Sequence, residues 1–305
     1  MDLSLVIVNW NTRELLLKCL TSVYETISDL CFEVWLVDNA STDGSLTAVD
    51  GRFPKVRLIR NSRNLGFAAA NNQALGQIKG RYALLVNTDV VITKGSVQAL
   101  FRFMEDTVEA GMACGQLLNL DGTKQNSIAN LPSPALLLTN ETLLRILFPK
   151  AYPSKLRRYE SPIEVESCIG ACLMVRKTAM DAVGLLDERF FFYFEETDWA
   201  CRMRKAGWKV FFVPAARFFH AQGQSVGHEA QSRLLFYRSR YQYLKKWFPK
   251  SYQLMVIAVM LRLLVNTFLT GVGVLFTGFY RPQMTHKFLI YIKILIWHLR
   301  GCPLD

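Results

Sequence analysis

Three carboxylates follow directly on a run of aromatic residues. Residues 190–194 read Phe-Phe-Phe-Tyr-Phe, and Glu195, Glu196 and Asp198 come next. Carboxylates this close repel one another, and an apolar wall beside them raises the pKa of at least one. A carboxylate with a raised pKa can accept a proton near neutral pH as a general base. The alternative is a buried strand followed by the acidic first turn of a helix, where negative charge favours the helix dipole.

Strands and helices alternate in the part of the chain that precedes this segment. Continuous apolar runs predict strands at residues 3–8, 32–37, 56–59 and 82–86. Apolar spacing predicts a helix after a cap at Thr12 and another over residues 67–77. The alternation indicates an α/β fold with a mostly parallel, Rossmann-like sheet sandwiched by helices.

Polar residues stand where three of these strands end. They are Asn9 and Asn11, Asp38 and Asn39, and Asn87 with Asp89. Ligands of such sheets bind beyond the carboxyl ends of the strands, so convergence on one edge predicts a nucleotide-type site. Ordinary turn chemistry is the alternative, because Asn and Asp favour turns.

The later part of the chain is less regular. Five prolines punctuate residues 131–163, which we expect to form an irregular insertion. A strand pair is expected over residues 164–176, and a helix starting at Thr197 or Asp198 and running to Lys205. Another strand is expected at residues 209–213, ended by Pro214.

The amino-acid composition indicates which binding partners and which compartment to expect. The 305 residues are 51% hydrophobic and carry a formal net charge of +11, which favours an anionic partner. The seven cysteines include no CxxC pair, so we expect reduced thiols and no zinc site. The first residues show no basic leader and only a short apolar run, so the catalytic part is expected in the cytoplasm.

Two apolar stretches lie near the C-terminus. Residues 254–279 are long enough to span a bilayer, although Arg262 and Asn266 interrupt them, and residues 288–299 are shorter. Basic residues flank the first stretch on both sides, which disfavours a single crossing and favours an interfacial or re-entrant helix pair on the cytoplasmic leaflet. A helical tail packed on the catalytic domain or on another subunit is the alternative. We therefore predict a catalytic domain at residues 1–245 and a membrane-associating segment at 246–305.

In order and spacing, these segments together resemble the family 2 glycosyltransferases, specifically the rhamnosyltransferase-like branch. The resemblance covers about residues 3–245 and rests on segments 8–11, 37–45, 64–68, 84–89, 170–174, 184–198 and 220–225. It implies a GT-A-type fold, a nucleotide-diphosphate sugar donor, a divalent cation (Mg²⁺ or Mn²⁺) and inverting transfer.

The resemblance also implies roles for single residues. Asp38 matches the position that contacts the base, while Asn64 and Gly66 match the nucleoside loop. The remaining donor-binding residues are expected to be Asn9, Asn11, Asn39, Asn87, Asp89, Gly170 and Ala171. Asp38 and Gly66 could equally serve only a turn and a loop.

Asp89 resembles the last acid of a DxD-type motif, in which Asn87 replaces the first acid, and His220 matches a position near the diphosphate. The cation is therefore expected at Asp89 and His220. Glu196 matches the catalytic base, which in the family is more often Asp, and Glu195 is the second candidate. Asp198 is expected either to contact the acceptor or to pair with Arg202 one helical turn later.

The sequence thus predicts an inverting glycosyltransferase that moves a sugar, with rhamnose as a guess, onto a saccharide acceptor. A cytoplasmic enzyme at the membrane surface favours a lipid-linked acceptor, in cell-surface polysaccharide or O-antigen synthesis. A membrane-associated protein that only binds nucleotide sugar or glycolipid is the alternative. A Rossmann oxidoreductase would show G-x-G-x-x-G after the first strand, and residues 8–11 contain no glycine. Nucleic acid is not expected as a partner, because the basic residues cluster beside apolar helices.

Overall fold

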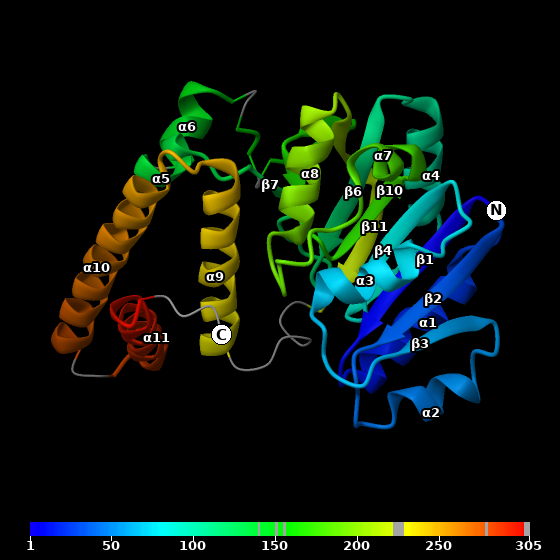
Figure 1. Ribbon diagram of the computed structural model, residues 1–305, viewed down its shortest axis with the longest axis horizontal. Coiled ribbons are helices and arrows are strands. Elements are labelled where there is room, and N and C mark those ends of the chain that lie inside the picture. Colours follow the sequence, from blue (N-terminus) through cyan, green and yellow to red (C-terminus); the bar gives the residue numbers. More distant parts are fainter. Residues whose placement is uncertain (140, 150–151, 155–156, 222–228, 278–279, 302–305) are drawn as a thin grey trace. The chain divides into compact units, whose positions relative to one another are not determined.

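The computed structural model describes residues 1–139, 141–149, 152–154, 157–221, 229–277 and 280–301 (Figure 1). The chain separates into two compact units. The first is Met1–Leu131 with Pro153–Ser225, and the second is Pro132–Tyr152 with Val226–Asp305. Residues 229–245, which the sequence analysis assigned to the catalytic domain, fall in the second unit. The division at residue 245 stays a prediction about domains that fold independently.

The first unit is built on a nine-stranded sheet. Its N-terminal half is parallel in the order β3-β2-β1-β4, formed by Val56–Arg60, Phe32–Asp38, Leu3–Asn9 and Tyr82–Asn87. The helices that connect these strands are α1 (Arg13–Thr26), α2 (Ser45–Asp50) and α3 (Phe67–Leu75). These elements lie close to the ranges that the apolar runs predict, and β1, β2 and β4 are buried along nearly their whole length, as continuous apolar runs indicate.

The other half of the sheet is mixed. Strand β10 (Cys172–Arg176) runs antiparallel to both β4 and β6 (Ala110–Leu118), and β11 (Lys209–His220) runs parallel to β6. Short strands β5 (Val90–Ile92) and β8 (Ile163–Val165) pair with β11. A separate ribbon joins β7 (Ile128–Ala129) to β9 (Ser167–Cys168). Residues 164–176 therefore contribute to three strands, β8, β9 and β10, which pair with other strands and not with one another. The prediction that this segment forms a strand pair is wrong.

Strand β11 is longer than predicted. Its register shifts between Val213 and Arg217, so Pro214 lies in an irregular stretch instead of ending the strand. A proline lacks the N–H that a regular ladder needs, and an irregularity accommodates it. The strand then continues to His220, which carries that side chain to the sheet edge beside β5.

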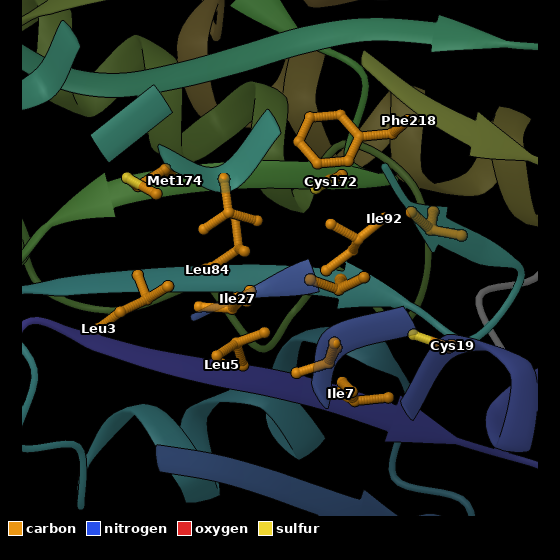
Figure 2. Close-up of a cluster of buried hydrophobic side chains, with 14 of the residues drawn as sticks. Leu3, Leu5, Ile7, Cys19, Ile27, Leu84, Ile92, Cys172, Met174 and Phe218 are labelled. Atoms are coloured by element: carbon orange, nitrogen blue, oxygen red, sulfur yellow. The ribbon is translucent and has the colours of Figure 1, made fainter. Parts of the chain in front are cut away.

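The core of the first unit lies on both faces of the sheet. Leu5 and Ile7 of β1 join one buried cluster, and Val6 joins the other. Figure 2 shows the first cluster, in which the β1 side chains lie near Leu84 and Met174 of neighbouring strands. Helices α4 (Ser96–Asp106) and α1 contribute to that face, while α3, α7 (Lys177–Val183) and α8 (Glu195–Lys205) contribute to the other. The result is the predicted sheet sandwiched by helices.

The second unit is helical. It contains α5 (Pro134–Leu138), α6 (Glu141–Leu147), α9 (Glu229–Trp247), α10 (Tyr252–Phe276) and α11 (Pro282–Leu299). The insertion expected to be irregular thus forms two short helices. Within the described residues, α10 is the one helix long and apolar enough to cross a membrane, with a mean hydropathy of 2.0. Only 17% of its most apolar window is buried, which distinguishes it from a core helix.

Candidate active site

Two strand ends are tied together by Asn9 and Asp38, which are partners in the β1–β2 ladder. The side-chain amide of Asn9 donates to Asp38 Oδ1 at 2.9 Å, and the backbone N–H of Ser41 donates to Asp38 Oδ2 at 2.9 Å. Thr12 donates its hydroxyl to Asn9 Oδ1 at 2.8 Å instead of capping α1. These bonds fix a buried carboxylate at the carboxyl edge of the sheet, where the sequence predicted it.

A second network joins Asn39 to the loop before α3. Its amide donates to Asn64 Oδ1 and to the carbonyl of Gly66, both at 3.2 Å. Asn64 Oδ1 also accepts from the N–H of Gly66 at 2.9 Å. Gly66 has φ +85°, a conformation that side-chain-bearing residues rarely adopt. Three of the predicted donor-binding residues, Asn39, Asn64 and Gly66, therefore form one hydrogen-bonded group.

Asn11 lies in the turn after β1 and faces a neighbouring turn. Its Oδ1 accepts from the backbone N–H of Thr42 at 2.7 Å, and its φ is +54°. Ala40, after β2, has φ +64°. A left-handed backbone conformation costs free energy at residues other than glycine, and such residues concentrate at functional sites. Asn11 and Ala40 follow two neighbouring strands, so they mark this edge of the sheet as a candidate site.

The aromatic segment is not a strand. Residues 191–194 form bends, and Tyr193 and Phe194 have φ of +70° and +71°. Consecutive left-handed residues cannot continue an extended strand, so the chain turns sharply and α8 begins at Glu195, two or three residues earlier than expected. The aromatic segment lies beside the start of α3, where the carbonyl of Phe191 accepts from the N–H of Phe67 at 2.7 Å.

Glu195 and Glu196 open α8 in different surroundings. Glu195 is buried, and its Oε2 has no hydrogen-bond partner among the described residues. Burial, and then the neighbouring Glu196, raise the pKa of Glu195 well above its usual value. Burial raises the pKa of Glu196 to about 7, although the backbone N–H groups of Glu196 and Thr197 oppose the shift. Glu196 therefore exchanges its proton near neutral pH, as the aromatic-acidic pattern predicted.

Gly170 lies against Glu196. A Cβ built on Gly170 would be 3.4 Å from Cγ of Glu196 and 3.5 Å from Cδ. Ala171 follows, and its carbonyl accepts from the N–H of Asn87 at 2.9 Å. The turn at residues 170–171 thus lies between Glu196 and the end of β4, so the structure brings the predicted base close to one of the predicted donor-binding strand ends.

Asp198 pairs with Arg202. It is fully buried, and its Oδ2 accepts from Nε of Arg202 at 2.9 Å. Arg202 in turn donates to the carbonyls of Val183 and Leu185, both at 2.6 Å. This arrangement favours the structural alternative for Asp198, the pair with Arg202, over contact with an acceptor.

Asp89 and His220 are neighbours because β5 and β11 pair. Val90 lies opposite His220, and the N–H of Ala221 donates to the carbonyl of Asp89 at 2.9 Å. Nε2 of His220 is 3.5 Å from Oδ1 of Asp89. The remainder of the predicted motif, residues 222–225, lies outside the described residues.

Gln125 orients His220, and sequence reasoning missed it. Its amide nitrogen donates to the carbonyl of His220 at 2.7 Å and to Asn119 Oδ1 at 2.6 Å, which leaves Oε1 facing Nδ1 of His220 at 2.8 Å. Nδ1 of His220 then donates to this oxygen, and in the neutral imidazole that tautomer leaves the Nε2 lone pair on the side of Asp89. No motif contains Gln125, and 95 residues separate it from His220. Only the fold reveals the pair.

The part of the chain that contains these strand ends matches a known sequence family. The pattern described as glycosyl transferase family 2 matches residues 4–184, more than half of the chain. The chain belongs to glycosyl transferase family 2. The glycosyltransferase family predicted from the motifs is confirmed.

Among known glycosyltransferases, the chain is similar to N-acetylglucosaminyl-diphospho-decaprenol L-rhamnosyltransferase of Mycobacterium tuberculosis. They share 33% identity over 221 residues, which cover 66% of this chain and 70% of that protein. The low-salt glycan biosynthesis hexosyltransferase Agl10 of Haloferax volcanii is 27% identical over 67% of this chain and 62% of its own length. The similarity to a rhamnosyltransferase agrees with the predicted branch.

Solved glycosyltransferase structures share the fold. The mannosyltransferase PcManGT from Pyrobaculum calidifontis, in complex with GDP-Man and Mn²⁺, superposes with a TM-score of 0.59 at 15% identity, over 98% of this chain and 87% of that one. GalNAc-T7 with UDP, GalNAc and Mn²⁺ gives a TM-score of 0.60 at 16% identity, over 83% of this chain but only 49% of that chain. These likenesses confirm the GT-A-type α/β fold.

The glycosyltransferase site offers oxygen and nitrogen ligands of the kind that a divalent cation takes. Oδ1 of Asn87 is buried without a hydrogen-bond partner among the described residues, and Asp89 and His220 lie beyond it in sequence and beside each other in space. The described part of the chain holds no group of three His, Cys, Asp or Glu side chains placed to bind a metal. The residues therefore fit a cation that completes its coordination with donor phosphates, as Mg²⁺ commonly does.

Proposed function

We propose that this glycosyltransferase transfers a sugar, with rhamnose as the first candidate, from a nucleotide-diphosphate donor to a hydroxyl of a lipid-linked saccharide. Transfer inverts the anomeric carbon, and the reaction belongs to cell-surface glycan synthesis. The observation that carries the proposal is Glu196, a carboxylate with a pKa of about 7 joined through Gly170 and Ala171 to the polar edge of the sheet.

In the proposed reaction, Glu196 takes the proton of the acceptor hydroxyl as its oxygen attacks the anomeric carbon. The bond between that carbon and the diphosphate oxygen breaks, and the nucleoside diphosphate leaves with the electron pair. Attack from the face opposite the leaving group gives inversion. A carboxylate with a pKa near the working pH is suited to this transfer, because it is both deprotonated and basic enough.

The donor would be held by the two strand-end networks. Asp38 would accept from a ring N–H of the base, and the loop of Asn64 and Gly66 would contact the nucleoside. Asn87, Asp89 and His220 would hold a divalent cation, which when bound neutralises charge on the leaving diphosphate. Asn9, Asn11 and Asn39 would keep the loops in place through the hydrogen bonds described above.

Glu195 would stay protonated. Its carboxyl is buried, and both burial and Glu196 raise its pKa. A neutral Glu195 lets Glu196 ionise without a second negative charge beside it. Asp198 would position α8 through Arg202 and stay out of the chemistry.

Membrane association would bring the acceptor to the enzyme. Large apolar side chains of α10 are exposed at helical spacing, namely Leu254, Ile257, Leu261, Leu264, Val265 and Phe268. Basic residues flank the helix, and anionic lipids of the cytoplasmic leaflet attract them. The similar mycobacterial enzyme is named for a diphospho-decaprenol substrate, which supports a lipid-linked acceptor. We therefore propose a location on the cytoplasmic face of the cell membrane.

Calorimetric titration of the full chain with dTDP-rhamnose, UDP-glucose and NAD, each with and without Mn²⁺, tests the donor. Metal-dependent binding of one sugar nucleotide selects it. Absence of sugar-nucleotide binding by folded protein contradicts the donor proposed here and favours a protein that only binds glycolipid. Tight binding of NAD contradicts the glycosyl-donor site. The anomeric configuration of the product, read by NMR, then tests inversion.

Co-sedimentation with anionic vesicles tests the membrane surface. The double variant Ile257→Glu and Leu264→Glu places charge on the exposed face of α10, where the two side chains are 52% and 43% exposed. Vesicle binding should fall at least about tenfold, since each charge opposes burial in the interface by a few kcal/mol. Gln253→Glu adds a charge at an exposed polar position of the same helix and should change binding far less. Equal losses in the two proteins would contradict the proposed membrane face.

A further inference from the structure

Two buried threonines lie among the strand ends of the candidate site. Thr88 directly follows β4, and Thr12 lies between β1 and α1. They are 3% and 8% exposed, and although 76 residues separate them in sequence, their hydroxyl oxygens are 2.8 Å apart. The fold therefore places two buried hydroxyl groups in contact at the edge of the sheet where the donor is proposed to bind.

Thr12 stands at the N-cap position of α1 but does not cap the helix. A threonine at this position usually accepts a hydrogen bond from a backbone N–H of the first turn. Here the side chain makes no capping bond, and its hydroxyl oxygen lies 2.8 Å from Oδ1 of Asn9 and 2.8 Å from the hydroxyl oxygen of Thr88. The hydroxyl of Thr12 thus serves the strand ends and not the helix that it precedes.

The direction of each hydrogen bond follows from the carboxylate at the end of the chain of contacts. A carboxylate oxygen accepts, so the amide nitrogen of Asn9 faces Asp38 at 2.9 Å and the amide oxygen faces Thr12. That amide oxygen can only accept, so the single hydroxyl hydrogen of Thr12 points to it. The oxygen of Thr12 then accepts from the hydroxyl of Thr88. The donors therefore run in one direction, from Thr88 through Thr12 and Asn9 to Asp38.

The Asn9 amide shapes what Asp38 can offer to a ligand. Oδ1 of Asp38 accepts from Asn9, and Oδ2 accepts from the backbone N–H of Ser41. A carboxylate has about four lone-pair sites, so acceptor capacity remains on both oxygens. The amide nitrogen of Asn9 also contacts the hydroxyl of Ser41 at 2.9 Å, but a hydroxyl can donate or accept and does not fix which way the amide faces. Thr12 fixes it, because its hydrogen is directed at the amide oxygen.

Loss of the Thr12 hydroxyl would change the Asn9 amide and leave α1 intact. No cap would be lost, and the N–H of Leu16 would still donate to the backbone carbonyl of Thr12, now at 2.8 Å. Oδ1 of the fully buried Asn9 would lose its donor, and a buried polar group without a partner is unfavourable. The amide could then rotate, and its alignment on Asp38 would weaken.

We propose that Thr12 is a positioning residue for the donor base. Through Asn9 it holds Asp38 in the orientation that accepts from the base, and Thr88 anchors it by fixing the rotation of its hydroxyl. The inference rests on the contact between Asp38 and the base in the proposed function. It assigns the residues that keep this carboxylate aligned.

A pair of substitutions separates the hydroxyl of Thr12 from its packing. Thr12→Val keeps the volume and loses the hydroxyl, whereas Thr12→Ser keeps the hydroxyl and loses a methyl group. Calorimetric titration of the full chain with dTDP and with UDP, each with Mn²⁺, reads the base contact. For the nucleotide that wild type binds, Thr12→Val should lose about tenfold in affinity, the effect of one misaligned hydrogen bond to a carboxylate, and Thr12→Ser should stay near wild type. Wild-type affinity in Thr12→Val, or equal losses in both variants, would overturn the proposal.

Inorganic diphosphate with Mn²⁺ provides a ligand that has no base. Thr12→Val should bind it as wild type does, because the proposed effect is confined to Asp38. An equal loss for diphosphate and for the nucleotide would mean a general distortion of the site and would overturn the role of Thr12. Thr26→Val is the matched control, since the Thr26 hydroxyl donates to the carbonyl of Ser22 within α1 at 2.6 Å. It should leave nucleotide affinity within about twofold, because its hydroxyl bonds only within the helix.

Thr88 gives an independent test, which also stands if Thr12→Val fails to fold. Thr88→Val should weaken nucleotide binding by about threefold, because it removes only the anchor, and Thr88→Ser should restore it. The double variant with Thr12→Val should bind no more weakly than Thr12→Val alone, since both act through one network. Fully additive losses would contradict the relay.

Wild-type binding separates this inference from the proposed function. Wild type that binds neither nucleotide would refute the proposed donor, and the role of Thr12 with it. Wild type that binds one nucleotide, together with equally tight binding by Thr12→Val, would refute only the role of Thr12.

Discussion

The backbone of Gly66 lies directly against the carbonyl oxygen of Phe191. A Cβ built on Gly66 would be 2.6 Å from that oxygen and 2.7 Å from Cδ2 of the Phe191 ring. The same oxygen accepts from the N–H of Phe67 at 2.7 Å. The predicted nucleoside loop and the aromatic segment that leads into Glu196 are therefore in contact, and only a glycine permits the approach.

Gly66→Ala should uncouple these two segments. The new methyl group meets backbone, and φ of +85° is itself unfavourable for alanine, so we expect a loss of stability of more than about 2 kcal/mol and a fall in turnover of at least about tenfold. Gly95→Ala is the matched control, since Gly95 has φ +82° with nothing within 4 Å of its Cβ position. It should cost about 1–2 kcal/mol in denaturant unfolding and leave turnover unchanged. Equal effects on turnover would exclude a special role for the contact.

Glu196→Gln should abolish transfer and leave donor affinity largely intact. A general base contributes about 10²–10⁴ in rate, and glutamine cannot accept the proton. In the wild-type enzyme the active form is the carboxylate, so turnover should rise with pH and reach half its plateau near pH 7. The residual activity of Glu196→Gln should lack this rise. Unchanged turnover in the variant would remove Glu196 as the base and point to Glu195.

Glu195→Gln should preserve transfer and change how stability depends on pH. The pKa of Glu195 is raised in the folded protein above the ordinary 4.5, so from about pH 4.5 upward the unfolded chain releases a proton that the folded chain keeps. Stability contributed by this group is complete below pH 4.5 and is lost as pH rises. Glutamine mimics the protonated form and removes that loss. Urea unfolding at several pH values measures it: the variant should gain stability relative to wild type as pH rises, and parallel curves would refute a protonated Glu195.

Much of the fold could be predicted from local pattern. The strand of residues 3–8 is a continuous apolar run, and the structure buries Leu5 and Val6 on opposite faces of the sheet. The strand past Pro214 could not be predicted, because the irregularity that accommodates the proline depends on pairing with β6. The bends at residues 191–194 were equally hidden, since Tyr193 and Phe194 adopt left-handed backbone against their usual preference.

The candidate site likewise contains some residues that the sequence predicts and one that it does not. Asn9 and Asp38 are found from sequence because each follows an apolar strand, and parallel pairing then brings strand ends together. Gln125 belongs to no motif, and its contact with His220 exists only because the chain after β6 returns beside the end of β11. Contacts between residues far apart in sequence depend on the tertiary arrangement, which local spacing does not encode.

The contact between Gln125 and His220 provides a test of the predicted cation ligands. Gln125→Leu removes the acceptor that holds the proton on Nδ1 of His220, so Nε2 loses its fixed lone pair toward Asp89. Outer partners of this kind typically contribute about 10–100-fold to metal affinity, so Mn²⁺ affinity measured with donor nucleotide should fall in that range. Gln77→Leu, at an exposed position of the same unit, should change nothing.

Gln125→Glu separates orientation from packing. A carboxylate still accepts from Nδ1 but cannot donate to the carbonyl of His220 or to Asn119, so the tautomer should survive while local stability falls. Nitrogen-15 NMR of the imidazole reads the tautomer without metal or turnover. We expect protonated Nδ1 in wild type and Gln125→Glu, and a mixture in Gln125→Leu. An unchanged tautomer in Gln125→Leu would show that other contacts of His220 set its orientation, and that Gln125 has only a packing role.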